Sequence, residues 1–111
     1  MAIFCAVDDD NFKRALMGAP LALVDFWASW CAPCRQLESI VETAAHTYAA
    51  EVKFCKVDVD RSPLLVTKYD VQAVPTLLFL RAGVLVSCRV GLLSLGELAK
   101  ELDMFLEESA Q

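Results

Sequence analysis

Two cysteines separated by two residues have the clearest chemical potential in this sequence. Cys31 and Cys34 flank Ala32-Pro33, shortly after the apolar, strand-length run Leu21–Trp27. Because proline lacks an N–H and has a fixed φ, Pro33 suits the first turn of a helix, with Cys31 at or just before that turn. The unpaired N–H groups and the dipole of a helix start stabilise a thiolate and lower its pKa. Cys34, one turn into the helix, can close a small disulfide ring and is expected to be more shielded.

Zinc binding is the competing interpretation, because zinc sites use the same cysteine spacing. Two further ligands would have to come from His46, Cys55 and Cys88. His46 is predicted to point away from the apolar face of its helix. Cys55 stands alone in an apolar strand pattern, and the alternation of Cys88 with Val86 and Val90 predicts an inward-facing, hydrophobic thiol. A catalytic cysteine pair is therefore favoured, and no metal is expected.

Asp25 lies within the apolar run Leu21–Trp27, where a carboxylate is costly unless it is neutral or well paired. Burial of this side chain would raise its pKa above the ordinary value. The alternative is an aspartate near the end of a strand whose carboxylate reaches solvent. A buried carboxylate with a raised pKa suits general-base chemistry near neutral pH.

The elements expected around these residues alternate strands with helices. Strands are predicted at residues 3–6, 21–27, 52–59, 76–81 and 84–90, with a tight hairpin turn at Ala82-Gly83. Helices are predicted after a cap at Asp8 or Asp9, from about Cys34, from Ser62-Pro63 to about Tyr69, and after a capping box of Ser94 and Glu97. The order βαβαβαββα is typical of an α/β fold with a mixed sheet of five strands, or of four, and helices on both faces.

Length and charge narrow the possible functions. The 111 residues fit one domain, and the formal net charge of −5 comes without a cluster of Lys and Arg, which disfavours nucleic acid as a partner. No apolar stretch approaches the roughly 18 residues of a membrane span, and the N-terminus lacks the basic region of a signal peptide. The expected location is the cytoplasm, where the five cysteines, an odd number, are kept mostly reduced.

The chain resembles the thioredoxin family in one register over nearly its whole length. Residues 24–34 are similar to the active-site segment of that family, 56–60 to its third strand, 74–76 to its cis-proline loop, and Gly83 and Gly91 to its later glycines. Ala32 stands where glycine is usual, and Ala73 where glycine or serine is frequent. Ser39 replaces a proline that usually kinks the active-site helix. The chain is identified as a member of this family, with residues 1–111 as a single thioredoxin domain.

The resemblance implies a thiol–disulfide oxidoreductase that reduces protein disulfides by exchange through Cys31 and Cys34. It implies that Asp25 is the proton acceptor that activates Cys34. Lys56, on the neighbouring strand, is implied as the matching cation that tunes the charge of Asp25. No bound cofactor is expected, because the dithiol itself carries the electrons.

Target recognition is implied to lie beside the cysteines. A cis peptide bond before Pro75 would place the Val74 backbone next to Cys31, ready to pair with an extended target segment. The expected contact surface comprises Trp30, Ala32, Pro33, Ala73, Val74, Pro75 and Gly91. The expected partners are disulfide-containing target proteins and a thioredoxin reductase as electron donor, and the chain itself is expected to be a monomer.

Two alternatives stay open. The same fold serves as an oxidant or isomerase in oxidising compartments, although neither a signal peptide nor a polar, His-containing pair between the cysteines supports that role here. A non-catalytic binding module would use only the apolar contact surface. A module that only binds proteins needs no sulfur chemistry. The presence of both cysteines, of Asp25 and of the segment around Pro75 therefore argues against that alternative.

Overall fold

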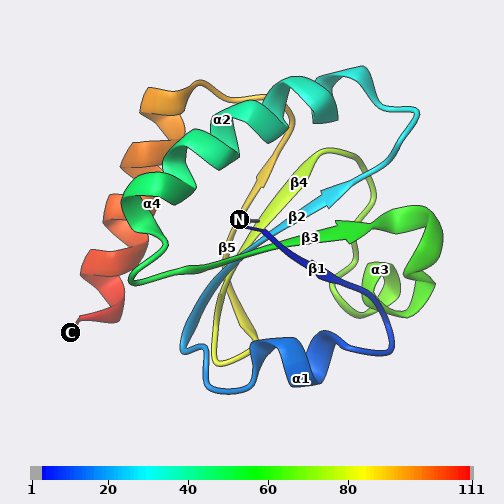
Figure 1. Ribbon diagram of the computed structural model, residues 1–111, viewed down its shortest axis with the longest axis horizontal. Coiled ribbons are helices and arrows are strands. Elements are labelled where there is room, and N and C mark those ends of the chain that lie inside the picture. Colours follow the sequence, from blue (N-terminus) through cyan, green and yellow to red (C-terminus); the bar gives the residue numbers. More distant parts are fainter. Residues whose placement is uncertain (1–3, 111) are drawn as a thin grey trace.

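The computed structural model of this protein describes residues 4–110, and its order of elements is the predicted βαβαβαββα (Figure 1). The elements are β1 (Cys5–Val7), α1 (Phe12–Leu16), β2 (Leu21–Trp27), α2 (Ala32–Tyr48), β3 (Lys53–Asp58), a 3-10 turn (Val59–Arg61), α3 (Pro63–Lys68), β4 (Thr76–Arg81), β5 (Val84–Val90) and α4 (Leu95–Ser109). No helix among these residues is long and apolar enough to cross a membrane.

The sheet is mixed, with five strands in the order β1-β3-β2-β4-β5. β1 and β2 each run parallel to β3, whereas β4 runs antiparallel to both β2 and β5. This arrangement confirms the five-stranded version of the predicted fold. β2 is the central strand, so the chain leaves the middle of the sheet at Trp27 and enters α2 only a few residues later.

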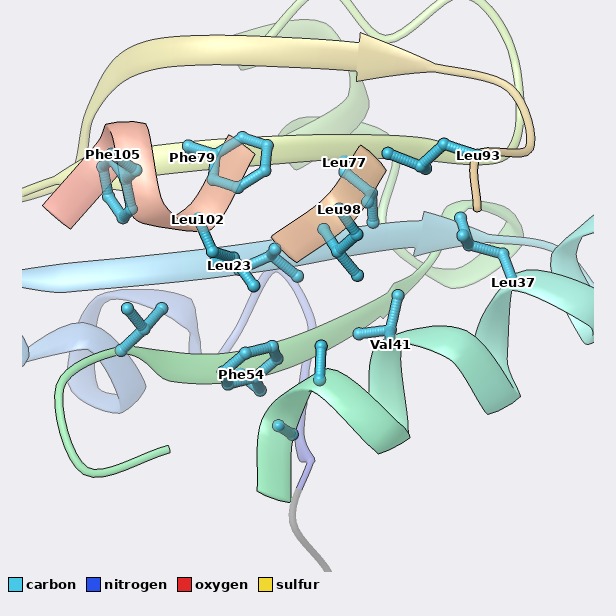
Figure 2. Close-up of a cluster of buried hydrophobic side chains, with 13 residues drawn as sticks. Leu23, Leu37, Val41, Phe54, Leu77, Phe79, Leu93, Leu98, Leu102 and Phe105 are labelled. Carbon is cyan, nitrogen blue, oxygen red and sulfur yellow. The ribbon is translucent and has the colours of Figure 1, made fainter. Parts of the chain in front are cut away.

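Helices cover both faces of the sheet. α2 and α4 lie on one face, where Leu23 of β2 and Phe79 of β4 pack with side chains of both helices; Figure 2 shows this cluster. α1 and α3 lie on the other face, where Phe12 and Leu65 pack against Val24 of β2. Successive residues of a strand point to opposite faces, so a strand covered on both sides is apolar along its length, as β2 is at every position except Asp25.

Several element boundaries differ from the prediction by one or two residues. α2 begins at Ala32 rather than near Cys34, and β3 ends at Asp58 because Val59–Arg61 forms a 3-10 turn. α2 runs without interruption through Ser39, the position where the family usually has a proline. The predicted first strand at 3–6 is observed as Cys5–Val7, and its residue 3 lies outside the described residues.

Asp9 was predicted as a possible cap of the helix that follows it, and this prediction is wrong. Its carboxylate accepts hydrogen bonds from the backbone N–H groups of Leu64 (3.0 Å) and Leu65 (2.9 Å), in the first turn of α3. Asp8, the other candidate, is not the cap either: it accepts from the N–H groups of Asp10 and Asn11 in the turn before α1, and Asn11 is the N-cap residue. Any helix start offers unpaired N–H groups, and the sequence alone does not tell which start a carboxylate will meet.

Two turn predictions are confirmed. Ala82 (φ 51°) and Gly83 (φ 79°) both adopt left-handed backbone conformations, as a two-residue hairpin turn between β4 and β5 requires. At the start of α4, the Ser94 hydroxyl accepts from the Glu97 N–H, and the Glu97 carboxylate accepts from the Ser94 N–H. The capping box fixes the point where α4 begins.

Cys88 was predicted to face inward, but its side chain is exposed. The cause is a β-bulge in β5, where the register with β4 shifts between Phe79 and Leu80. Val86 packs against the cluster beneath α4, whereas Cys88 lies opposite Leu78, whose side chain points to the other face. The bulge breaks the simple alternation, and β5 is an edge strand with little above it at Cys88.

Candidate active site

Cys31 and Cys34 lie at the junction between the central strand β2 and helix α2. Cys31 is the N-cap residue of α2, and Pro33 occupies the first turn, as predicted. The two cysteines are joined in a disulfide with their Cα atoms 5.3 Å apart, and the Cys31 Sγ accepts a hydrogen bond from the Cys34 backbone N–H (3.2 Å). An N–H of the helix start therefore points directly at this sulfur, which stabilises negative charge on it when the disulfide is reduced.

The turn before α2 holds both sulfurs in a small apolar setting. The Cys31 N–H donates to the Ala28 carbonyl (3.2 Å), and the Arg35 side chain donates to the Ser29 carbonyl (2.9 Å), which closes the turn. Cys31 is 5% exposed and Cys34 is 3% exposed, so exposed area does not separate them in the disulfide form. The two cysteines differ in their positions relative to α2, because Cys31 precedes the first turn of the helix and Cys34 lies inside that turn.

Asp25 is buried in the middle of the sheet, as predicted, and does not reach solvent as the alternative required. The residue is 1% exposed, and its Oδ1 accepts no hydrogen bond from any residue in the described range 4–110. Burial raises the pKa of Asp25 from 3.8 to about 7, and the charge of Lys56 opposes that rise while the charge of Glu38 adds to it. This carboxyl group can therefore gain or lose a proton near neutral pH.

Lys56 lies directly opposite Asp25 in the parallel pairing of β2 with β3. Its ammonium group forms an ion pair with Glu38 of α2 and lies 4.7 Å from the centre of the Trp27 ring. Lys56 thus forms its ion pair with Glu38 and acts on Asp25 through its charge. The sequence analysis did not single out Glu38. The available signal was its spacing, because Glu38 lies one helical turn after Cys34.

These groups line one cleft. Its volume is about 350 Å³, and it is lined by Asp25, Trp27, Ala28, Ser29, Cys34, Arg35, Glu38 and Lys56. A buried carboxyl group and the sulfur of Cys34 therefore border the same space. Glu38 and Lys56 are only partly buried and Arg35 is exposed, so charged side chains connect the cleft to solvent.

The predicted contact residues lie mostly at the surface. The Val74–Pro75 peptide bond is cis, and Val74 packs against the apolar cluster that contains both active-site cysteines. Gly91 (φ 92°) donates its N–H to the Pro75 carbonyl at 2.9 Å, which ties the loop before β4 to the end of β5. Pro75 itself is buried, so its ring supports the loop from within and does not form the contact surface.

The exposed part of that surface is apolar. Trp30 is 68% exposed, with its indole N–H donating to Asp60 (3.0 Å), and Ala32, Pro33 and Ala73 are also exposed. The indole is thus held at one edge while its ring faces solvent. An aromatic ring fixed in this way offers contact area at little entropic cost.

The residues that could have made a zinc site are apart. His46 is exposed on α2, Cys88 is exposed on β5, and Cys55 is buried on the sheet face covered by α1 and α3. Within residues 4–110, no group of three or more His, Cys, Asp or Glu side chains is placed to hold a metal ion.

Comparisons with known proteins agree with this geometry. A family model described as Thioredoxin matches residues 3–104. The chain is 36% identical over 107 residues to Thioredoxin 1 of Synechococcus elongatus, covering 96% of this chain and 100% of that protein. It is 39% identical over 98 residues to a thioredoxin of Acidithiobacillus ferridurans, covering 87% and 91% of the two chains. It is 36% identical over 96 residues to Thioredoxin 2 of Chlorobaculum tepidum, covering 86% and 88%.

Proposed function

This chain belongs to the thioredoxin family and is a thiol–disulfide oxidoreductase that reduces protein disulfides, and we propose that Cys31 is its attacking thiol and Cys34 its resolving thiol. The observation that carries this assignment is the N-cap position of Cys31, whose Sγ accepts the Cys34 N–H. The helix start favours the thiolate of Cys31, and the thiolate is the nucleophile in disulfide exchange.

The reaction transfers two electrons through two exchanges. The Cys31 thiolate attacks one sulfur of the target disulfide, which forms a mixed disulfide and releases the other target sulfur as a thiolate. Cys34 then loses its proton and attacks the Cys31 Sγ, which breaks the mixed disulfide and releases the second target thiolate. The target gains two electrons and, with solvent protons, two thiols, while Cys31 and Cys34 become the disulfide seen in the structure.

Asp25 is the group that takes the Cys34 proton in this scheme. Its pKa of about 7 suits a base near neutral pH, and it borders the same cleft as Cys34. Lys56 and Glu38 act through Asp25: the ammonium group favours the carboxylate, and the Glu38 carboxylate opposes it. We therefore assign Lys56 and Glu38 as positioning residues that set where Asp25 titrates.

Target binding in this proposal uses the loop before β4. No backbone hydrogen bond within residues 4–110 outside the regular helices and strands involves Val74, while its side chain packs beside the two cysteines. A target segment can therefore pair with the Val74 backbone as an added strand, which tolerates many target sequences. Trp30, Ala32, Pro33 and Ala73 supply the apolar surface around it.

The partners of the reaction follow from its chemistry. Disulfide-containing proteins are the substrates, and a reductase must return two electrons to the Cys31–Cys34 disulfide after each turnover. We propose a thioredoxin reductase in that role, a cytoplasmic location, and a monomer made of one domain over residues 1–111.

A turnover assay tests this function. The reduced protein is supplied with a disulfide-containing protein substrate and dithiothreitol, and release of substrate thiols is followed with time. We expect catalysis far above the rate with dithiothreitol alone. Reduction no faster than dithiothreitol alone, with binding of the substrate retained, would instead identify a non-catalytic binding module.

A further inference from the structure

Two cysteines outside the active site lie directly opposite each other in the sheet. Cys5 opens β1, Cys55 lies in β3, and the two are register partners in the parallel pairing of these strands. Both are free thiols in the structure. Figure 1 shows β1 running alongside β3 at the edge of the sheet. The proposed reaction of Cys31 and Cys34 uses neither thiol, so this pair needs an explanation of its own.

The distance between these strands suits a disulfide. Neighbouring strands lie about 4.8 Å apart, and disulfides join Cα atoms that are about 4.4–6.8 Å apart. Register partners also point to the same face of a sheet, and both side chains belong to the cluster beneath α1 and α3. Burial is the main cause of the raised pKa of Cys55, and the neighbouring Cys5 thiol adds to the rise.

The two thiols differ in access to solvent and in their place in the sheet. Cys55 is completely buried, whereas Cys5 is half-buried at the start of a three-residue edge strand that pairs with β3 alone. Burial raises the pKa of Cys55 to about 12, so its thiolate is scarce at neutral pH. An oxidant therefore meets Cys5 first, and the short edge strand can shift to let the sulfurs join.

We propose that Cys5 and Cys55 form a second redox-active pair, which a peroxide closes into a disulfide that ties β1 to β3. The Cys5 sulfur attacks a peroxide oxygen, breaks the O–O bond and becomes a sulfenic acid, with one water released. The Cys55 sulfur then attacks the Cys5 sulfur, loses its proton and displaces the hydroxyl as a second water. In total, two thiols are oxidised by two electrons and the peroxide is reduced to two waters.

The pairing of the two thiols would also protect Cys5 from irreversible oxidation. A sulfenic acid without a neighbouring thiol goes on to irreversible sulfinic and sulfonic acids. Cys55 lies in register beside Cys5 and can intercept that intermediate. The disulfide closes a long loop between the two strands, which restricts the unfolded chain and holds the weakly paired β1 in place.

Peptide mapping of the wild-type chain tests this proposal. The fully reduced protein is treated with hydrogen peroxide, blocked with a thiol reagent and cut with trypsin. Cleavage after Lys13, Lys53 and Lys56 places Cys5 and Cys55 in separate short peptides, both distinct from the active-site peptide. We expect these two peptides to be joined by a disulfide within the monomer. Neither peptide should carry the added oxygen mass of a sulfinic or sulfonic acid, and a reductant should separate them again.

Two variants sharpen this test. In Cys5→Ser, Cys55 should stay a free thiol at the same peroxide dose, because it is buried and has no partner in register. In Cys88→Ser, which removes the exposed thiol most able to link two chains, the Cys5–Cys55 link should form as in the wild type. Oxidation of Cys5 to sulfinic acid beside an unmodified Cys55, or a link between chains, would overturn the proposal.

Discussion

The molecule holds two pairs of cysteines in contrasting settings. Cys31 and Cys34 lie at a helix start, where a backbone N–H points at sulfur and a buried carboxyl group borders the same cleft. Cys5 and Cys55 lie side by side within the sheet, where burial raises the pKa of Cys55 and neither residue caps a helix. The comparison teaches that proximity makes a disulfide possible, whereas the surroundings of the sulfur decide how fast it reacts and with what.

The largest expected effect concerns the two active-site thiols. Cys31→Ser should reduce turnover of protein disulfides to background, because no nucleophile remains at the helix start. Cys34→Ser should still attack but should accumulate mixed disulfides, since nothing resolves them. Mass spectrometry of trapped species after incubation with a target protein distinguishes the two.

The other thiols provide the control for this result. Cys88→Ser, on the exposed edge strand, should keep wild-type turnover. Equal trapping of targets by Cys31→Ser and Cys34→Ser would show that the assigned roles are wrong. Turnover that persists in Cys31→Ser would show that other thiols carry out the reaction, and that the two cysteine pairs do not differ in reactivity as proposed.

The next effect is on stability. The folded pKa of Asp25, about 7, lies above the ordinary value of 3.8, so ionising this carboxyl costs the folded state. The cost grows as the pH rises from about 4 to about 7 and is constant above that. The difference between these two pKa values corresponds to roughly 4 kcal/mol, so Asp25→Ala should be more stable than wild type by a few kcal/mol at pH 8.

Denaturant melts at several pH values measure this difference, which should vanish below about pH 4. The exposed Asp10→Ala should show no such pH-dependent gain. Cys55→Ala should alter the pH dependence only above about pH 9, because the raised pKa keeps that thiol neutral in the folded state until about pH 12. An Asp25→Ala variant no more stable than wild type at pH 8 would contradict the assigned titration.

A smaller effect is expected from Glu38. Glu38→Gln removes a negative charge that raises the pKa of Asp25 and frees Lys56 from its ion pair. The pKa of Asp25 should fall by less than about one. The rate at which Cys34 resolves the mixed disulfide increases with pH, and this increase should occur at a pH that is lower by the same amount.

The control for this variant lies one turn further along α2. Glu42→Gln changes the same charge on the exposed face of the helix, outside the cleft, and should leave the pH profile in place. The profile is measured by stopped-flow kinetics of target release. A profile that stays unchanged or moves to higher pH in Glu38→Gln would remove Glu38 from the set of positioning residues.

The smallest expected difference is in redox potential. Ala32 and Pro33 add no charge and no side-chain donor between the cysteines, so the Cys31 thiolate gains no help beyond the helix start. We expect a potential within about 30 mV of the value of about −270 mV that is typical of thioredoxins, which corresponds to about 1.4 kcal/mol. Equilibration with a glutathione buffer, followed by tryptophan fluorescence, gives the value. A potential above about −200 mV would instead favour an oxidant or isomerase.

Local sequence patterns were sufficient for most of the fold and for the core of the site. The apolar run of β2, the hairpin at Ala82-Gly83 and the capping box of Ser94 and Glu97 each depend on neighbouring residues, and each was predicted. The burial of Asp25 was predicted for the same reason, because the apolar residues on either side of it are typical of a strand buried on both faces.

The errors arose where distant segments or backbone irregularities decide the outcome. Asp9 meets the start of α3 only after the chain has folded back, and the bulge that turns Cys88 outward has no marker in the sequence of β5. The pairing of Glu38 with Lys56 joins a helix to a strand. Alternation along one segment cannot reveal such contacts, because they depend on register and packing between segments.

The position of β1 has a consequence for synthesis of the chain on the ribosome. β1 is made first, but its sole partner in the sheet is β3, and Asp9 finds its partners in Leu64 and Leu65. The N-terminal segment therefore leaves the ribosome before β3 and α3, the elements that it contacts, have been synthesised, and β2 and α2 are made in between. β1 can pair only after β3 has been synthesised, and the sheet is complete only after β5 has followed. Until β1 pairs, the open edge of β3 is available to other chains.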